Sequence, residues 1–404
     1  MNRAKGFVIS AGRVATPTEI LENAFVVVEG GTVREVGAGR PPAGPGELVE
    51  LGDVLVAPGL VDLHVHGGGG HDVNCETPEE AEAAVREVVR YHASHGTTSL
   101  VATTVSDTHE VLASAVEGIA RVARESGSGV LGTNLEGPWL SPRRAGAQYP
   151  GALRPPSLAE LSDLLERAGG TLRLLTLAPE LPGALEVVRA ATAAGVVVSV
   201  GHTDADYATT VAAFDAGASQ VTHLFNGMAP LHHRRPGPPG AALTDPRAHL
   251  EVVSDGVHLH PAVVSMVAAL APERMLFITD AIGASGSPPG RYRLGPIEVL
   301  VDENRAVLAD GSGTIAGSVL TMDRAIGFAV KSAGVPLTTA LRAASLTPAS
   351  VLGEKEKGRL GPGADADMVV LDQDYRAVAT MVAGRVVHDP GGRLGALGAG
   401  LGAR

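Results

Sequence analysis

The sequence predicts an α/β protein: a (β/α)8 TIM-type barrel with a small β-sandwich domain formed from both ends of the chain. Three observations support this prediction. The 404 residues are 45% hydrophobic but only 3% aromatic, and an interior of Val, Leu, Ile and Ala is typical of parallel strands covered by helices. From Val56 onward, strand-like apolar runs alternate with helical patterns. At both ends of the chain, apolar and polar positions alternate with a period of two.

The two ends predict the β-sandwich. Residues 6–55 form short β-type runs, and Gly30-Gly31 lies between two of them at the position of a hairpin turn. After a predicted helix that ends at Gly353, the runs GRLGPGADADMVVLD and YRAVATMVAGRVVH show the same alternation and can pair with the N-terminal strands. We therefore predict a β-sandwich domain of residues 1–54 plus 352–392. Residues 393–404 have too little bulk to pack and are predicted to be disordered.

The pattern of residues 55–351 predicts the barrel. Helical patterns follow strand-like runs, with glycine before the next strand. In order, the runs are LVDLHVH, SLVATTV, VLGTNLE, LRLLTLAPE, VVVSVGH, QVTH, LEVVSD and MLFITD. Eight such units are what a (β/α)8 barrel of roughly 250 residues requires. The rival arrangement, a doubly wound open sheet, would place functional side chains at one switch point rather than around a ring.

Five of the apolar runs stop at side chains that bind metals. These side chains are His64 with His66, Glu136, His202, His223 and Asp280. Imidazole nitrogen and carboxylate oxygen, without sulfur, suit a hydrolytic Zn, Fe(II) or Mn site. A polar residue at the end of a buried strand explains any one run, but it explains all five poorly. In a barrel the C-terminal ends of the strands meet around one mouth, so we expect these side chains to lie together.

Two cations could be bound there, with Glu136 between them. One site would consist of His64, His66, Glu136 and Asp280, and the other of Glu136, His202 and His223. A bound cation lowers the pKa of water toward neutrality. Asp280 could act as a general base that takes a proton from this water and returns it to a leaving amine. It could also be a plain helix N-cap, and both roles can coexist.

Two loops beside these residues suggest a phosphate site. HVHGGGGHD and HLFNGMAPLHHRRPG are rich in glycine or amide groups, and main-chain N–H groups in such loops can bind an anion. Arg234 and Arg235 strengthen this prediction, because a guanidinium binds phosphate oxygens through paired hydrogen bonds. A solvated loop arginine explains either residue equally well when it is taken alone.

Composition excludes several classes of function. The net charge is −12 and no run is rich in Lys or Arg, which argues against a nucleic-acid partner or an anionic membrane surface. The N-terminus lacks the apolar core of a signal peptide, and no stretch reaches about 18 apolar residues. The single Cys75 excludes an intrachain disulfide and fits a reducing compartment. We expect a soluble cytoplasmic protein.

Motifs along most of the chain point to a family. In order, they are PGLVDLHVHG (58–67), GTTSLVATT (96–104), LEGPWLSP (135–142), GHTDADY (201–207), THLFNGMAP (222–230), SDGVH (254–258), ITDAIGASG (278–286) and TIAGSVLTM (314–322). This series resembles the amidohydrolase superfamily and, within it, the N-acetylglucosamine-6-phosphate deacetylases. The resemblance covers nearly the whole chain except the C-terminal tail. PG-x-x-D-x-H-x-H identifies only the superfamily, whereas LEGPW, THL-x-N-x-M and AGS-x-LTM together are much more specific.

The resemblance implies a role for each matching residue. Glu136, His202 and His223 match the principal metal ligands, Asp280 matches the catalytic acid/base, and His64 and His66 match the additional ligands of members that keep His-x-His. Substrate-contacting positions are Ala147, Gln148, Asn226, Gly227, His258 and Ile315. Arg234 matches a phosphate-binding arginine that reaches in from the neighbouring subunit of a homodimer. Relatives usually carry histidine at the position of Gln148, and glutamine can hydrogen-bond but cannot carry a proton or a charge.

The implied activity is metal-dependent hydrolysis of the acetamide of N-acetyl-D-glucosamine 6-phosphate. Hydroxide generated at one or two divalent metals would be the nucleophile, with Asp280 as general acid/base, and the partner is thus a small sugar phosphate. One alternative is an amidohydrolase that acts on another N-acylated amino sugar or a cyclic amide, which Gln148 keeps open. A second is a non-catalytic scaffold on the same barrel, although such a protein is expected to have lost its metal ligands.

Overall fold

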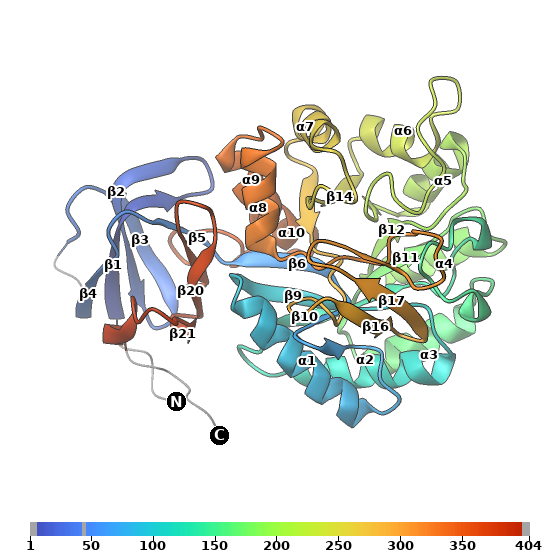
Figure 1. Ribbon diagram of the computed structural model, residues 1–404, viewed down its shortest axis with the longest axis horizontal. Coiled ribbons are helices and arrows are strands. Elements are labelled where there is room, and N and C mark those ends of the chain that lie inside the picture. Colours follow the sequence, from blue (N-terminus) through green and yellow to red (C-terminus); the bar gives the residue numbers. More distant parts are fainter. Residues whose placement is uncertain (1–5, 43–45, 398–404) are drawn as a thin grey trace. The chain divides into compact units, whose positions relative to one another are not determined.

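The computed structural model describes residues 6–42 and 46–397 (Figure 1). The chain divides into two compact units. One takes in the chain up to Asp62, Arg90–Ser99 and the chain from Thr321 onward, and the other consists of Leu63–Val89 and Leu100–Leu320. Each unit is built around its own large sheet.

The first of these sheets is parallel and carries the candidate site. Its eight strands follow the order β15-β14-β13-β12-β11-β10-β9-β6, and the pairs from β9 to β15 are parallel. The strands are β6 (Leu60–Val65), β9 (Thr97–Thr104), β10 (Val130–Glu136), β11 (Leu172–Leu177), β12 (Val197–Val200), β13 (Gln220–Val221), β14 (His249–Val253) and β15 (Met275–Ile278). The eight predicted strand-like runs are therefore confirmed, in chain order.

Backbone contacts join the two outer strands of this sheet, β6 and β15, at their C-terminal ends. Val65 forms a parallel bridge with Ala281. The backbone N–H of His66 donates to the carbonyl oxygen of Ala281 at 2.9 Å, and the N–H of Asp280 donates to the carbonyl oxygen of His64 at 2.9 Å. These contacts close the sheet into a barrel at the level of the candidate ligands, so the predicted fold class is confirmed.

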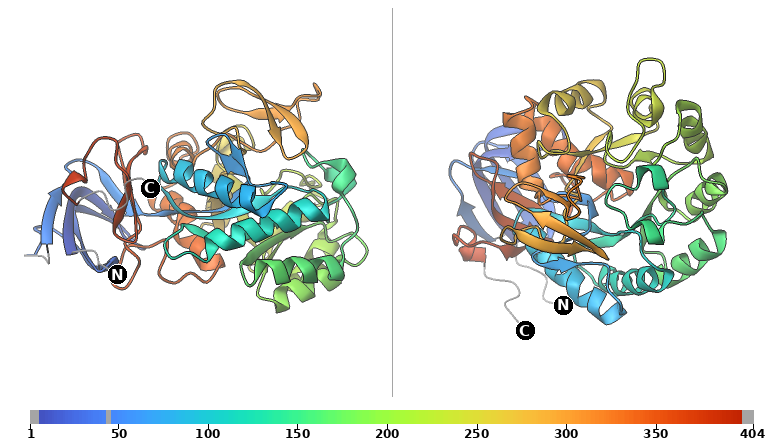
Figure 2. Two further views of the ribbon diagram at one scale, coloured as in Figure 1. Left: turned by 90° about the horizontal axis from the view of Figure 1, so that it is seen from below. Right: turned by 45° about the vertical axis from the view of Figure 1, so that its right-hand side comes forward.

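Each barrel strand is followed in the chain by a helix. The helices are α1 (Pro78–Ala93), α2 (His109–Ala123), α3 (Leu158–Ala168), α4 (Ala184–Ala193), α5 (Tyr207–Ala216), α6 (Gly237–Thr244), α7 (Pro261–Leu270) and α8 (Met322–Lys331). The side chains of Thr108, Ser157 and Asp206 cap the first turns of α2, α3 and α5. The right-hand view of Figure 2 shows the cyan, green and yellow helices as an arc around the strands.

A small antiparallel sheet lies between β15 and α8, and the sequence patterns do not predict it. It consists of β16 (Gly290–Leu294), β17 (Ile297–Val301) and β18 (Ala306–Leu308). Leu294 and Val299 pack in one buried cluster with Val105 and Ile282. The turn between β16 and β17 uses Gly295 at a positive φ of 52°, and an added Cβ there would lie 2.9 Å from Val105 Cγ2.

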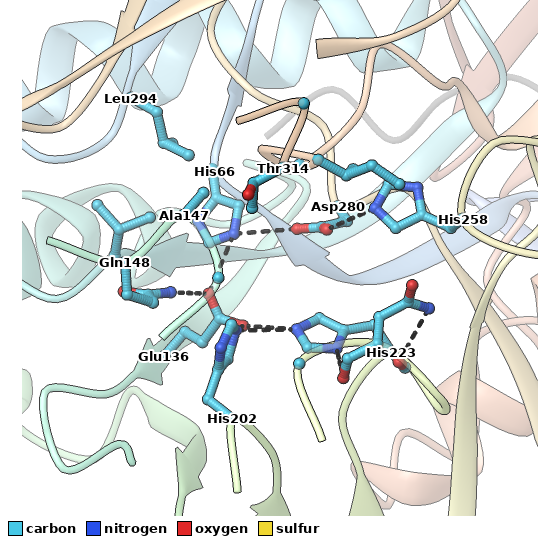
Figure 3. Close-up of a pocket in the computed structure, with 17 residues that line it drawn as sticks. His66, Glu136, Ala147, Gln148, His202, His223, His258, Asp280, Leu294 and Thr314 are labelled. Carbon is cyan, nitrogen blue, oxygen red and sulfur yellow. Dashed lines mark hydrogen bonds and ion pairs between the residues drawn. The ribbon is translucent and has the colours of Figure 1, made fainter. Parts of the chain in front are cut away.

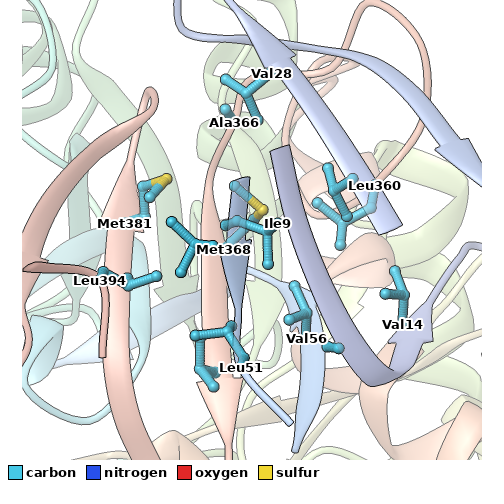
Figure 4. Packing of buried hydrophobic residues seen from close by; sticks show 14 of the residues in the cluster. Ile9, Val14, Val28, Leu51, Val56, Leu360, Ala366, Met368, Met381 and Leu394 are labelled. Carbon is cyan, nitrogen blue, oxygen red and sulfur yellow. The ribbon is translucent and has the colours of Figure 1, made fainter. Parts of the chain in front are cut away.

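The second large sheet combines strands from both ends of the chain, as predicted. Its order is β21-β20-β19-β5-β1-β2-β3, with β4 paired to β1. The strands are β1 (Gly6–Ala15), β2 (Ile20–Glu29), β3 (Thr32–Ala38), β4 (Gly46–Glu50), β5 (Leu55–Pro58), β19 (Met368–Leu371), β20 (Ala377–Val382) and β21 (Arg385–His388). The predicted hairpin at Gly30-Gly31 joins β2 to β3, with both glycines at positive φ. Figure 4 shows the apolar cluster of this sheet, which includes Ile9, Val56 and Met368.

Three details refine the predicted layout. The apolar stretch from Leu55 to Val65 forms two strands that belong to different sheets. β5 pairs with β1 and β19, while β6 belongs to the barrel sheet. The predicted helix before Gly353 is two helices, α9 (Leu337–Ala344) and α10 (Leu346–Val351). In the segment predicted to be disordered, Leu394 is buried and η3 (Gly395–Leu397) is a short 3-10 helix, while residues 398–404 lie outside the described residues. The predicted domain boundaries remain a prediction.

Within the described residues, 6–42 and 46–397, no helix is both long enough and apolar enough to cross a membrane.

Candidate metal centre

Six side chains at the ends of five barrel strands come together in two neighbouring groups. Figure 3 labels five of them: His66, Glu136, His202, His223 and Asp280. Among the described residues they form two groups whose ligand atoms lie within 4.8 Å of one another: His64 with His66 and Asp280, and Glu136 with His202 and His223. All six residues are buried. His64 and His66 share a face because side chains on a strand alternate with a period of two. All six predicted ligands are thus brought together.

Three of these residues have an unusual backbone. His202, His223 and Asp280 have positive φ angles of 45°, 27° and 52°. Each lies two residues beyond the end of its strand, β12, β13 or β15. A non-glycine residue in the left-handed region is uncommon and costs of order 1–3 kcal/mol. Such strain is concentrated at functional sites, where the surrounding structure holds the residue in place.

The imidazole rings face one another through their Nε2 atoms. These atoms are 3.1 Å apart in the pair His64 and His66, and 3.1 Å apart in the pair His202 and His223. A hydrogen bond between two neutral rings would need one Nε2 to carry a hydrogen. Whether Nε2 carries that hydrogen depends on Nδ1, because a neutral imidazole has one N–H and one nitrogen with a free lone pair.

Every Nδ1 atom in the cluster already has an acceptor. The acceptors are Glu251 Oε2 for His64 at 3.2 Å, the Thr103 carbonyl for His66 at 3.0 Å, the Arg144 carbonyl for His202 at 2.8 Å and the Asn226 carbonyl for His223 at 3.1 Å. Because these oxygens only accept, each Nδ1 carries a hydrogen, and in the neutral form of each ring Nε2 then has a free lone pair. Two lone pairs 3.1 Å apart repel each other unless a cation lies between them. The donor set therefore fits divalent metals.

Glu136 contacts both groups of candidate ligands. Its Oε1 lies 3.1 Å from His202 Nε2 and 3.0 Å from His223 Nε2. Its Oε2 lies 3.4 Å from His66 Nε2. This single carboxylate at the end of β10 thus contacts both groups, and its role as a bridge between two cations remains a prediction.

Asp280 faces both the imidazoles and the cavity. Its Oδ1 is 3.1 Å from His66 Nε2 and 3.5 Å from His64 Nε2. Its Oδ2 is 3.6 Å from Nε2 of His258, whose Nδ1 is held by Asp255 at 2.8 Å. The carboxylate therefore contacts the first group of ligands through one oxygen and His258 through the other.

The electrostatics of the cluster favour ionised carboxylates beside positive charge. Burial raises the pKa of Glu136, but the charges of His64 and His202 and hydrogen bonds from the imidazoles hold this pKa well below its usual range. Burial likewise raises the pKa of Asp280, but His66 and His64 lower it to about 2. Burial lowers the pKa of His64, yet Glu136 and Glu251 hold it well above its usual value. A bound cation satisfies the same demand for positive charge.

A cavity of about 340 Å³ opens onto the cluster, within the size range of small-molecule sites. Its wall includes the predicted substrate contacts Ala147, Gln148, Asn226, Gly227, His258 and Ile315. Arg234 is exposed and does not line the cavity of its own chain. The sequence did not point to Val105, Leu294 and Thr314, which also line it. The first two bring part of the apolar cluster beneath the small antiparallel sheet to the wall of the cavity.

Comparison with known proteins is decisive for the family. Residues 55–387 match the model of the amidohydrolase family. The chain belongs to this family. N-acetylgalactosamine-6-phosphate deacetylase of Escherichia coli O157:H7 is 39% identical over 345 residues, which cover 85% of this chain and 90% of the relative. N-acetylglucosamine-6-phosphate deacetylase of Bacillus subtilis (strain 168) is 33% identical, with 95% and 97% coverage. The structure of N-acetyl-D-glucosamine-6-phosphate deacetylase from Mycobacterium smegmatis has 42% identity and a TM-score of 0.89, covering 94% of this chain and 100% of that one.

In this amidohydrolase, Gln148 contacts a candidate metal ligand as well as the cavity. Its Nε2 donates to Glu136 Oε2 at 2.6 Å, and its Oε1 accepts from the backbone N–H of Ser106 at 2.8 Å. The side chain is almost fully buried. Beyond the predicted contact with substrate, Gln148 therefore fixes the direction of the carboxylate that joins the two groups.

Sequence reasoning missed Glu251, which holds the Nδ1 of His64 in this amidohydrolase. A signal was available, because Glu251 stands inside the apolar run LEVVSD. A charged residue is almost never fully buried unless it is paired. The run itself, however, does not indicate which partner the carboxylate contacts.

Proposed function

We propose that this amidohydrolase hydrolyses the acetamide of N-acetyl-D-glucosamine 6-phosphate to D-glucosamine 6-phosphate and acetate. The observation that carries the proposal is the pair of ligand groups joined by Glu136 at the wall of a substrate-sized cavity. The names of the relatives support the substrate class, because they are deacetylases of 2-acetamido sugar 6-phosphates.

The chain's own residues would hold one or two divalent metals. Glu136, His202 and His223 form one site, and His64, His66 and Asp280 form the other, with Glu136 within reach of both. When bound, a divalent metal supplies a Lewis acid for the amide carbonyl and makes water more acidic. Zn, Fe(II) and Mn all accept nitrogen and oxygen ligands of this kind.

Asp280 is the residue proposed to move the proton. Its Oδ2 lies 3.6 Å from Nε2 of His258, and both residues line the cavity, where this oxygen can receive a proton from water. The same proton can then pass to the leaving amine nitrogen, which must be protonated to depart. Asp255 holds the ring of His258 against this carboxylate.

Substrate recognition is assigned to the cavity wall and to the phosphate. The sugar would contact Gln148, Asn226 and His258, and the backbone of Gly227 would approach it closely. We assign the 6-phosphate to Arg234 of a second copy in a homodimer. This assignment is supported by the exposure of Arg234 and by its absence from the cavity of its own chain.

The proposal is tested by acetate release from metal-loaded protein. Zn2+, Mn2+ or Fe2+ is added to the chelated protein, and N-acetylglucosamine with and without the 6-phosphate is assayed. We expect metal-dependent release, a strong preference for the phosphorylated sugar, and loss of turnover in Asp280→Asn at unchanged folding. Asparagine keeps the shape of the side chain but cannot act as a base. If the folded, metal-loaded protein released no acetate, the proposal would be wrong.

A second candidate substrate is N-acetyl-D-galactosamine 6-phosphate. A relative that is 39% identical carries that name, and Gln148 stands where relatives usually have histidine. The two sugars differ only at C4, so kcat/KM for both epimers with the same metal-loaded protein decides between them. Equal values would place the enzyme's specificity in the acetamide and phosphate groups alone.

We also propose a cytoplasmic location. A phosphorylated amino sugar is charged and does not cross a membrane unaided, so its enzyme is expected where the sugar is phosphorylated. The single half-buried Cys75 suits a reducing compartment. Fractionation of the native cells with an antibody against the chain tests this.

A further inference from the structure

Glu251 is a buried carboxylate inside the barrel, in the middle of β14. It is 1% exposed. Among the described residues, Glu251 forms an ion pair with His64. A buried carboxylate is costly unless its charge and its lone pairs are satisfied. Its partners therefore show what it does.

Both carboxylate oxygens are hydrogen-bonded inside the barrel. Oε2 lies 3.2 Å from His64 Nδ1 and accepts the backbone N–H of His223 at 3.1 Å. Oε1 accepts Nε2 of Gln220 at 2.6 Å. Gln220 is also fully buried, on β13. Glu251 thus touches one residue of each group of candidate ligands, and Gln220 holds it from the opposite side.

The acceptor for the Nδ1 hydrogen of His64 differs from the acceptors for the other three histidines of the cluster. His66, His202 and His223 each give their Nδ1 hydrogen to a neutral backbone carbonyl. His64 alone gives it to a carboxylate. A carboxylate fixes the tautomer and ring orientation of a histidine and also makes its other nitrogen a stronger ligand.

We propose that Glu251 is a positioning residue that sets the metal affinity of the site formed by His64, His66 and Asp280, and that Gln220 holds Glu251 in place. This proposal rests on the metal centre of the proposed function. The effect is selective, because the ring nitrogens of His202 and His223 do not contact Glu251. What Glu251 gives the second site is one hydrogen bond to the backbone of His223.

Glu251→Gln separates the charge from the hydrogen bonds. The glutamine oxygen can accept from His64 Nδ1 and from the N–H of His223, as Oε2 does now. Its amide group would then face Gln220, whose own Oε1 is buried and has no hydrogen-bond partner among the described residues. Rotation of the Gln220 amide lets this oxygen accept from the new glutamine. The variant therefore keeps all three side-chain contacts of Glu251, one of them with donor and acceptor exchanged, and removes the negative charge behind His64.

The experiment is a titration of the chelated full-length protein with Zn2+, read by calorimetry, with bound metal counted by mass spectrometry. We expect wild type to bind two Zn2+ per chain, and His64→Ala to identify which event belongs to the His64 site. Glu251→Gln should weaken that event by roughly 10- to 100-fold, the usual effect of losing a partner behind a metal ligand. The other event should keep its wild-type affinity.

Two further variants keep the outcome interpretable. Gln220→Met removes the support of Glu251 at a distance from the ligands, and should weaken the same event by a smaller factor even if Glu251→Gln folds poorly. Glu160→Gln is the matched control, since Glu160 is a largely buried carboxylate of the same unit that contacts Arg154, Trp139 and His109 but no candidate ligand. It should bind both Zn2+ ions with wild-type affinity.

The outcomes distinguish this proposal from the one on which it rests. Two Zn2+ ions bound with wild-type affinities in Glu251→Gln and Gln220→Met would overturn the role of Glu251 and leave the two-metal centre standing. Equal weakening of both events would make Glu251 a structural residue and also overturn the proposal. A wild-type protein whose Zn2+ binding does not respond to His64→Ala would overturn the His64 site itself, and the role of Glu251 with it.

Discussion

Replacement of Gln148 by leucine tests whether the direction of Glu136 matters for catalysis. The substitution keeps the volume of the side chain roughly constant and removes two buried hydrogen bonds. One joins Gln148 Nε2 to Glu136 Oε2 at 2.6 Å, and the other joins the N–H of Ser106 to Gln148 Oε1 at 2.8 Å. The two losses affect different quantities.

The hydrogen bond to Glu136 is the one expected to affect the rate. A buried hydrogen bond to a charged group contributes about 1.5–3 kcal/mol. If its loss is felt fully in the transition state, kcat/KM falls by roughly 10- to 150-fold, because each 1.36 kcal/mol is a factor of ten. Leaving the N–H of Ser106 without an acceptor costs about 1–3 kcal/mol. This second cost is present with and without substrate, so it lowers stability rather than rate.

The assay is steady-state acetate release by metal-loaded Gln148→Leu, with its metal content and melting temperature recorded alongside. Gln148→His introduces the residue that the family resemblance implies here, and its imidazole can still donate to Glu136, so this variant should retain most of the activity. Gln148→Glu places a second carboxylate against Glu136 and should be the least active variant. A kcat/KM for Gln148→Leu equal to that of wild type, at equal metal content, would refute the reasoning.

Three other predictions follow from the same structure. Chelation should abolish activity and lower the melting temperature, because a ligand that binds only the folded chain stabilises it. Acetate release and scanning calorimetry, before and after Zn2+ is restored, measure the two changes, and an unchanged melting temperature would count against a metal centre. Arg234→Ala should raise KM for the phosphorylated sugar and leave turnover of N-acetylglucosamine unchanged. Mixed dimers of Arg234→Ala and Asp280→Asn chains should regain activity, because the site that keeps Asp280 receives Arg234 from the other chain. Their failure to do so would argue against an arginine that acts across subunits. Leu175→Ala in β11, where the leucine is fully buried, should cost about 2–5 kcal/mol, and a melting temperature equal to that of wild type would contradict this packing.

Much of the barrel could be predicted because buried parallel strands leave a simple signal. A strand covered on both faces is mostly apolar, so a polar residue after an apolar run marks the end of many strands. In this chain that residue is often a ligand, as at Glu136, which ends β10 itself. The strand ends therefore located the six candidate ligands together with the fold. The His-x-His spacing at His64 and His66 also indicated that both rings lie on one face.

Features that depend on contacts between distant segments could not be predicted in this way. The sheet of β16, β17 and β18 has strands of only three to five residues, too short for a clear period. The hydrogen bond of Gln148 to Glu136 and that of Glu251 to His64 join residues 12 and 187 positions apart. The residue type indicates that a partner is needed, but only the packed fold determines which partner it is.

The left-handed backbone at three candidate ligands shows how the fold prepares this site. No motif indicates that His202, His223 and Asp280 adopt positive φ, although His and Asp tolerate it better than most residues. The backbone carbonyl of each residue accepts a hydrogen bond. Distant segments supply two of the donors, the N–H of Ser141 to His202 at 2.9 Å and the N–H of Ser318 to Asp280 at 2.7 Å. The third donor, the N–H of Asn226 to His223 at 2.9 Å, lies in the same turn. These contacts offset strain of order 1–3 kcal/mol per residue within the folding free energy. Because the chain itself makes these contacts, the fold supports the strained backbone at the three candidate ligands.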